Sequence, residues 1–174
     1  MKSLMIAASL AALSVAAPAL AQDNPVTVYG TVGYANTDAD GVNLGAIQGR
    51  IGARYGQYLG LEGELAGGVK SDEIKIVGTR YDVDLNYQAA VYGVGYLPVA
   101  PNADLFARVG YGKSKIDVSG PFAAGSADGE SWNYGVGGQY FFTEKDGVRV
   151  DLTRHDFDNG GDADVVGVSY VRKF

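Results

Sequence analysis

Hydrophobic and polar residues alternate along eight separate segments of the chain. In an extended strand, residues two apart point to the same face. Each segment therefore predicts a β-strand with one apolar face and one polar face. The eight segments cover residues 26–36, 46–56, 60–70, 83–97, 103–114, 130–142, 147–155 and 166–174.

Short and long connections alternate between these segments, and this pattern predicts how the strands are joined. The short turns lie near residues 57–58, 98–102 and 143–146. The longer polar loops lie near residues 37–45, 71–82, 115–129 and 156–163. Turns at one end and long loops at the other are typical of an up-and-down barrel with an even number of strands.

The last segment indicates which face of each strand points outward. Val166, Val168, Tyr170 and Phe174 lie on one face, and Gly167 lies on the other. An apolar outer face with a polar back suits a strand whose outer side meets lipid. Only helices and closed barrels satisfy their backbone hydrogen bonds in lipid. The sequence therefore predicts an all-β fold, an eight-stranded antiparallel up-and-down transmembrane β-barrel that occupies residues 22–174.

The first 21 residues have a different pattern. Lys2 is followed by an apolar stretch, then by Pro18 and the small-residue sequence Ala19-Leu20-Ala21. This order is typical of a secretory signal peptide that is cleaved after Ala21. The apolar stretch is shorter than the roughly 20 residues that a membrane-spanning helix needs. We therefore expect residues 1–21 to direct export and to be removed.

Composition narrows the possible functions. The chain has 14 basic and 20 acidic residues, a net charge of −6, which disfavours nucleic acid as a partner. It has no cysteine, so disulfides and thiolate metal sites are excluded. Its 26 glycines and 12 tyrosines suit twisted strands with aromatic borders better than long helices.

Charged residues alternate with the outward apolar positions, so we expect them inside the barrel. They form a predicted polar network of Arg50, Arg54, Glu62, Glu64, Arg108, Arg149 and Asp151. Pairing across the second turn would place Arg54 opposite Glu62. Because buried charges are costly unless they are paired, the near balance predicts a salt-bridged interior and not a wide channel. The alternative is that these residues control a narrow conductance.

Outward aromatic residues are expected to gather at two depths, because amphipathic rings prefer the headgroup level of a membrane. The predicted girdle consists of Tyr34, Tyr87, Tyr111, Trp132 and Tyr134 near the loops, and of Tyr55, Tyr140, Phe142 and Phe174 near the turns.

Three sequence segments carry a family resemblance: the ending GVSYVRKF, the segment LFARVGYGKS at residues 105–114, and WNYGVGGQYFF at residues 132–142. With them the chain resembles the small eight-stranded outer-membrane barrels of the OmpA/OmpX type. The resemblance implies a bacterial outer-membrane location, contact with outer-membrane lipids and lipopolysaccharide, and insertion by the barrel-assembly machinery, which would read Tyr170 and Phe174. It also implies a role in adhesion, envelope integrity or contact with an extracellular ligand at the loops. No residues follow the predicted barrel, so the peptidoglycan-binding domain of OmpA is not expected.

Candidates for chemistry are few. His155 is the only histidine, and lipid A deacylases of similar size use a His-x-Ser pair. Phe157 occupies the place of the serine and alternation sends His155 inward, so we expect no catalytic residues. Four aspartates around Gly160-Gly161 only loosely match a calcium loop, so neither a metal nor a cofactor is expected. The alternatives are a narrow-pore porin, a lipid-modifying enzyme and a soluble ligand-binding barrel with apolar residues inside.

Overall fold

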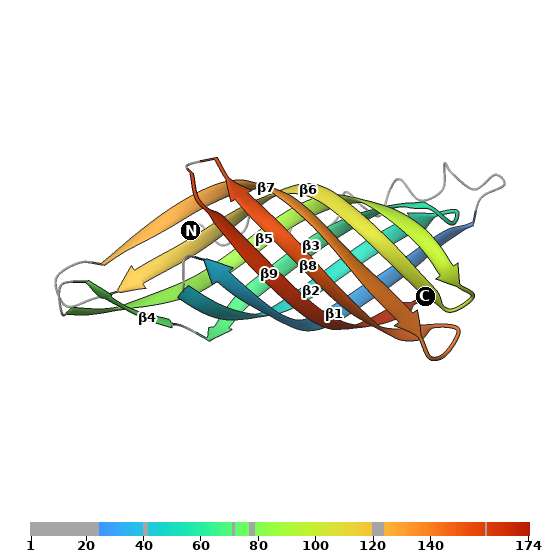
Figure 1. The fold of residues 1–174 in the computed structure, drawn as a ribbon, viewed down its shortest axis with the longest axis horizontal. Coiled ribbons are helices and arrows are strands. Elements are labelled where there is room, and N and C mark those ends of the chain that lie inside the picture. The colour runs from blue at the N-terminus through green and yellow to red at the C-terminus, as the bar shows by residue number, and fades with distance from the viewer. Residues whose placement is uncertain (1–24, 40–41, 71, 77–78, 120–123, 159) are drawn as a thin grey trace, which may run out of the picture.

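The computed structural model describes residues 25–39, 42–70, 72–76, 79–119, 124–158 and 160–174. These residues form nine strands, whose arrangement is drawn in Figure 1. The strands are β1 (Val26–Ala39), β2 (Val42–Tyr55), β3 (Leu59–Lys70), β4 (Asp72–Ile76), β5 (Thr79–Ala100), β6 (Ala103–Ser119), β7 (Ala124–Phe141), β8 (Asp146–Phe157) and β9 (Asp162–Lys173). The predicted signal peptide lies outside the described residues and stays a prediction.

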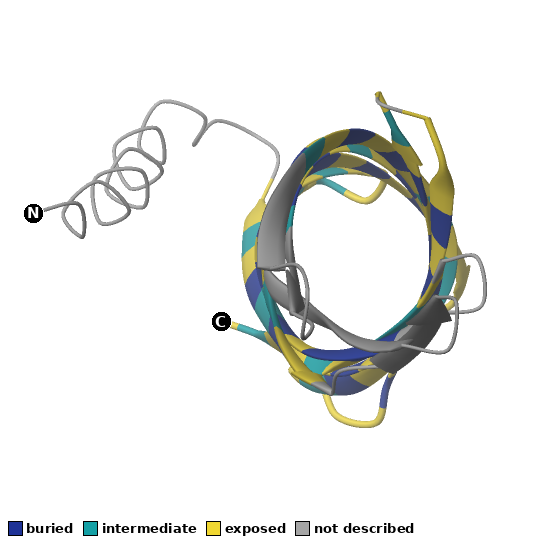
Figure 2. Ribbon diagram, turned by 90° about the vertical axis from the view of Figure 1, so that its left-hand side faces the viewer, coloured by how far each residue is buried: buried dark blue, intermediate teal, exposed yellow. Residues whose placement is uncertain are grey.

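Eight of the strands close into a ring. The sheet runs β3-β2-β1-β9-β8-β7-β6-β5, and a further pairing of β3 with β5 closes it. Every pairing is antiparallel. The ring is seen along its axis in Figure 2. The predicted eight-stranded antiparallel barrel is therefore confirmed.

The ninth strand, β4, lies in a segment that was expected to be a loop. It pairs only with the start of β5, from Asp72 opposite Val83 to Ile76 opposite Thr79. The ladder between β6 and β7 likewise continues to Ser119 opposite Ala124. Strands β5, β6 and β7 thus extend beyond the other strands at one end of the barrel (Figure 1). The predicted strands were too short there because a backbone ladder needs no apolar side chains, whereas the sequence pattern ends where the apolar face ends.

The connections define the two ends of the barrel. The β2–β3, β5–β6 and β7–β8 connections lie at what we call the turn end, and the opposite end is the loop end. The β1–β2 connection at the loop end was predicted to be a long loop over residues 37–45, and this prediction is wrong, because the ladder between the two strands continues to Ala39 opposite Val42. In the β2–β3 turn, Gly56 has a φ of 61°, a conformation that favours glycine. In the β7–β8 turn, the Thr143 hydroxyl accepts a hydrogen bond from the Asp146 amide at 2.8 Å. Pro98, expected in a turn, lies within β5, so the β5–β6 turn is shorter than predicted.

Outward and inward residues alternate as the sequence pattern predicts. On the outer wall, Val109, Val136 and Val168 are 55–60% exposed, whereas Arg50 and Glu62 inside the ring are at most 4% exposed. The alternation is visible as stripes of exposed and buried residues in Figure 2. The arrangement is the reverse of a soluble ligand-binding barrel, because the apolar face points away from the axis.

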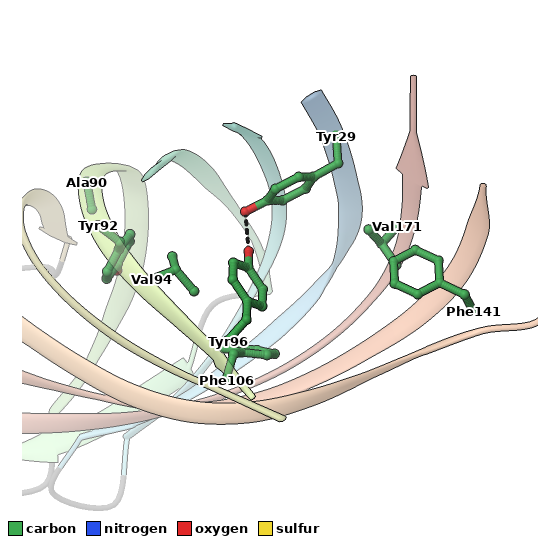
Figure 3. Packing of buried hydrophobic residues seen from close by; sticks show 8 residues of the cluster. All are labelled: Tyr29, Ala90, Tyr92, Val94, Tyr96, Phe106, Phe141 and Val171. Atoms are coloured by element: carbon green, nitrogen blue, oxygen red, sulfur yellow. Dashed lines mark hydrogen bonds between the residues drawn. The ribbon is translucent and has the colours of Figure 1, made fainter. Parts of the chain in front are cut away.

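A smaller apolar cluster lies inside the barrel. It combines aromatic, valine and alanine side chains from several strands, shown in Figure 3. Tyr29, Phe141 and Val171 contribute to it from the parts of β1, β7 and β9 near the turn end. No helix long and apolar enough to cross a membrane occurs in the described part of the chain.

Candidate functional site

The centre of the barrel interior holds a network of ion pairs. Arg50 on β2 lies directly opposite Glu64 on β3 in the ladder, and its Nε donates to Glu64 Oε2 at 2.5 Å. The two terminal nitrogens of Arg50 donate to the two carboxylate oxygens of Asp151 at 2.8 and 3.0 Å. This two-fold contact is the strong form of an arginine–carboxylate pair, and it ties β2 to β8 across the lumen.

Arg108 on β6 completes this central group. Its terminal nitrogens donate to Glu64 Oε2 at 3.2 Å and to Asp151 Oδ2 at 2.7 Å. Its Nε donates to the Thr153 hydroxyl at 3.0 Å. Each carboxylate is therefore shared by the same two arginines, and the four side chains form a closed ring of charge. Because every charge has an opposite partner, the cost of its burial is offset.

A second group lies around Glu62. Arg149 donates to both of its carboxylate oxygens, at 2.5 and 3.1 Å. The hydroxyl of Tyr29 donates to Glu62 Oε1 at 2.6 Å and lies 2.5 Å from the hydroxyl of Tyr96. The contact between the two tyrosines is drawn in Figure 3. Glu62 on β3 thus contacts side chains from β1, β5 and β8.

The predicted placement of Arg54 opposite Glu62 is wrong. In the β2–β3 ladder Arg54 lies opposite Gly60, and Glu62 lies opposite Gly52. Arg54 instead reaches Asp104 on β6, with contacts of 2.9 and 3.1 Å, because its side chain crosses the lumen and does not follow the hairpin. Asp104 also accepts a hydrogen bond from Gln139 Nε2 at 2.9 Å.

Asp104 is the interior charge that the sequence prediction missed. The alternation of inward and outward positions already indicated it, since Asp104 shares the inward face of β6 with Phe106 and Arg108. With Asp104, four carboxylates balance the four arginines of the interior. The other residues of the predicted network all lie inside the barrel, and Arg54 is its most accessible arginine, with a side chain 13% exposed.

Aromatic rings lie against three of the four interior arginines. The guanidinium of Arg149 lies 3.9 Å from the centre of the Phe106 ring. Arg54 lies 4.3 Å from the ring of Tyr96, and Arg108 lies 4.5 Å from that of Tyr92. These contacts add cation–π attraction to the ion pairs. Sequence alternation places these rings inward but does not show which cation each one meets.

The residues of the predicted girdle all lie on the outer wall. Their exposed fractions range from 39% for Tyr55 to 72% for Phe174. Near the loop end, the rings of Tyr111 and Trp132 meet edge to face at 5.4 Å. Near the turn end, the amide of Phe174 donates to the carbonyl of Val28 at 2.9 Å, so the last residue is tied to β1. Tyr170 is exposed on the same wall.

His155 lies inside the barrel and is 2% exposed. Its ring contacts that of Phe157, with centres 6.4 Å apart. Within the described ranges, no three His, Cys, Asp or Glu side chains are grouped so that they could hold a metal ion. The side chains of the loop-region carboxylates Asp40, Asp72 and Glu73 lie outside the described residues.

The sequence matches a family model described as the outer membrane protein β-barrel domain over residues 6–174. A search of curated protein sequences finds no significant match.

Several solved structures resemble the fold. The attachment invasion locus protein Ail of Yersinia pestis, solved with the heparin analogue sucrose octasulfate, has a TM-score of 0.58 and 16% identity, covering 88% of this chain and all of Ail. Neisserial surface protein A has a TM-score of 0.59 and 10% identity, with the same coverage. The N-terminal barrel of Pseudomonas aeruginosa OprF has a TM-score of 0.59 and 14% identity, covering 86% of this chain and 99% of that domain. At these identities the likeness shows the shape of the fold.

Proposed function

The chain belongs to the outer membrane protein β-barrel domain family, and on this premise we propose that it is a structural and surface-contact protein of the bacterial outer membrane, without catalysis. The observation that carries this proposal is the interior network. Its four arginines and four carboxylates link β2, β3, β6 and β8 across the lumen. An eight-stranded barrel is only wide enough for its side chains to fill the inside. Because side chains fill the interior, it leaves no wide pore. The filled interior therefore supports a function carried by the outer wall and the loops.

We predict that the purified protein shows no sustained ion current in planar bilayers. The ion pairs around Arg108 and Arg50 would have to separate before an ion could pass, and their separation would leave buried charges unpaired. Insertion would be verified by a difference in gel mobility between unheated and heated samples. A steady current that Arg108→Met alters would contradict the proposal and favour a narrow-pore porin.

The loops are the surface that would meet an extracellular partner. Their four predicted ranges contain ten acidic and three basic residues. Among the described side chains at this end, Arg154 is itself paired with Asp162 and with Asp164, at 3.7 Å for the latter. An acidic rim attracts cationic or cation-bridged partners and repels polyanions. Ail was solved with a sulfated sugar, and the acidic rim of this chain disfavours a polyanion of that kind as its partner.

We predict that the folded protein does not bind immobilised heparin at physiological salt, because its loop end is acidic. A matched comparison is the same protein with Asp156, Asp158 and Asp162 changed to Asn. This variant removes three negative charges from one loop and should interact more strongly with heparin or be excluded less. Retention of the unchanged protein on the column, released by salt, would contradict an acidic contact surface.

The outer wall supports the proposed contacts with lipid. Aromatic residues near both ends, such as Trp132 and Tyr140, are exposed there together with aliphatic side chains between them. We propose that the rings mark the two headgroup levels, with the loop end in the leaflet that contains lipopolysaccharide. We also propose that Tyr170 and Phe174 act as the signal for the barrel-assembly machinery.

The position of His155 supports the absence of catalysis. A lipid-modifying enzyme needs its nucleophile and base at the lipid-facing wall, whereas His155 points into the lumen. Phe157, two residues after His155, lies beside it and has no nucleophilic group.

A further inference from the structure

A hollow of about 630 Å³ interrupts the outer wall over β2, β3, β5 and β6. Its floor is formed by the small outward residues Gly93, Gly95 and Ala107. The register places them side by side, because Gly95 on β5 lies opposite Ala107 on β6. Of the lining residues only Arg108 is charged, and its side chain is buried in the lumen. The hollow is therefore an apolar one, and we call it the wall hollow.

Larger side chains form the rim of the wall hollow. Leu59 and Leu61 stand beside it on β3, and Val109 stands beside it on β6. Along β5, Val91 and Leu97 flank the two glycines on the same outward face. All five side chains are more than half exposed, so they project from the wall. A ligand in the hollow would thus be contacted on several sides, whereas a flat wall offers contact on one side only.

The space above the floor is open. A Cβ added to Gly95 would meet nothing within 4 Å, and one added to Gly93 would lie 3.9 Å from the nearest atom, the carbonyl oxygen of Val109. By contrast, a Cβ on Gly110 would lie 2.1 Å from a backbone oxygen. The two floor glycines are therefore not required by the backbone of the neighbouring strands, and no side chain of the described residues covers them.

The position of the hollow indicates which leaflet it faces. On β2, β3, β5 and β6, every lining residue falls in the half of the strand nearer the turn end. Tyr55, a member of the girdle near the turns, is one of them. With the loop end in the leaflet that contains lipopolysaccharide, the hollow faces the opposite, periplasmic leaflet, where phospholipids supply the acyl chains.

A second copy of the chain would fill the hollow poorly. A two-fold interface brings the same patch of both subunits together. It would set hollow against hollow and leave both floors without contacts, and unfilled space forfeits dispersion attraction. Inside a bilayer all surroundings are apolar, so close packing decides which neighbour is preferred. A thin, flexible hydrocarbon chain can enter the hollow and contact floor and rim together.

We propose that the wall hollow holds an acyl chain of a phospholipid of the periplasmic leaflet, and that this lipid exchanges more slowly than its neighbours. The site is continuous with the apolar wall of an outer-membrane barrel. Residues 55–61 and 89–103, which include the two adjacent turns, contain no Asp, Glu, Lys or Arg. Recognition is therefore of the tail and not of the headgroup. This inference deepens the proposed contact with lipid and rests on the proposed orientation of the loop end.

The test is Gly95→Leu, which fills the floor of the hollow without striking the backbone. The protein is inserted into nanodiscs of phosphatidylethanolamine and phosphatidylglycerol, and the lipids that stay bound after its release are counted by native mass spectrometry. We expect the unchanged protein to retain one phospholipid more than Gly95→Leu. Ala107→Leu, which fills the floor from β6, should show the same loss. Equal retention by all three proteins would overturn the proposal, and so would retention that follows headgroup charge and not these substitutions.

Gly49→Leu is the matched control. Gly49 faces outward on β2 and does not line the hollow, and a Cβ there would lie 3.8 Å from the nearest atom, the carbonyl oxygen of Thr31. This variant should retain as many phospholipids as the unchanged protein. A loss equal to that of Gly95→Leu would show that any bulk added to the wall displaces lipid, and the proposal would fall. Folding of each variant is verified by the difference in gel mobility between unheated and heated samples.

A second measurement locates the lipid on the unchanged protein. A phospholipid with a photoreactive group in its acyl chain is introduced into isolated outer membranes, and the labelled peptides are identified. We expect more label in residues 91–97 and 105–109 than in β8 and β9. Equal labelling around the wall would overturn the site, and labelling of the hollow by photoreactive lipopolysaccharide instead would overturn the phospholipid assignment and the orientation. Neither failure would change the expected lack of ion current, which tests the proposed function separately.

Discussion

Replacing Glu62 with Gln should lower the free energy of unfolding of the barrel by about 3 to 5 kcal/mol, the usual loss when one partner of a buried ion pair is removed. Glu62 is the only carboxylate within hydrogen-bond distance of Arg149 among the described residues, and both side chains are fully buried. The substitution conserves size, so the loss would come from the charge left on Arg149. Urea titrations followed by the fluorescence of Trp132, the only tryptophan, would measure it.

The control is the same substitution at Glu130. Its contact with Lys113 is 3.6 Å long and both side chains are half-exposed, so Glu130→Gln should change stability by less than about 1 kcal/mol. The double variant Glu62→Gln with Arg149→Met should lose less stability than the sum of the two single variants, because it leaves no unpaired charge. Equal effects of Glu62→Gln and Glu130→Gln would show that the interior network does not stabilise the barrel.

Replacing Gly110 with Ala should destabilise the barrel by about 3 kcal/mol or more, at the upper end of the usual effect of overpacking. A Cβ at this position would lie 2.1 Å from the carbonyl oxygen of Val91 and 2.6 Å from the ring of Tyr92. The first of these atoms belongs to the backbone of the neighbouring strand. Relief would therefore require β5 and β6 to move apart, which would strain their ladder of hydrogen bonds.

Gly95→Ala is the matched control on β5. A Cβ there would meet nothing within 4 Å, because Gly95 faces outward from the wall. Its effect on stability should stay within about 0.5 kcal/mol. Both variants would be folded into the same micelles, and their urea midpoints and gel mobilities compared. If Gly110→Ala is as stable as Gly95→Ala, the close approach of β5 and β6 is not a constraint on the fold.

The strand interiors were predictable because one rule, alternation, governs them. It correctly gives the inward direction of Arg50, Glu64 and Arg108, since a strand with one lipid face leaves no other place for charge. The partners of these residues were not predictable in the same way. Arg50 and Asp151 are 101 residues apart, and Arg149 and Glu62 are 87 apart. Such pairs depend on how the strands are staggered around the closed ring, which no local pattern records.

The ends of the strands were less predictable for a different reason. Beyond the apolar wall, both faces of a strand can be polar, so the start of β7 carries no alternation of hydrophobicity. In β4, Ile74 and Ile76 alternate with Glu73 and Lys75, but this five-residue segment is too short for the pattern to mark a strand. Asp104 was overlooked at a similar boundary, only two residues after a turn. At these positions hydrogen bonding of the backbone decides the structure, and side-chain chemistry gives little warning of it.

The pairing of β9 with β1 has a consequence for how the protein is made. Tyr29 to Asp38 of the first strand pair with Asp164 to Lys173 of the last. The seam therefore joins the first strand of the barrel to its last strand, and β1 is synthesised well before β9. An unfinished polypeptide leaves two open strand edges, which are prone to aggregate. The barrel cannot close before β9 has been synthesised, and such distant contacts form slowly. Until β9 pairs with β1, both edges stay open to other strands.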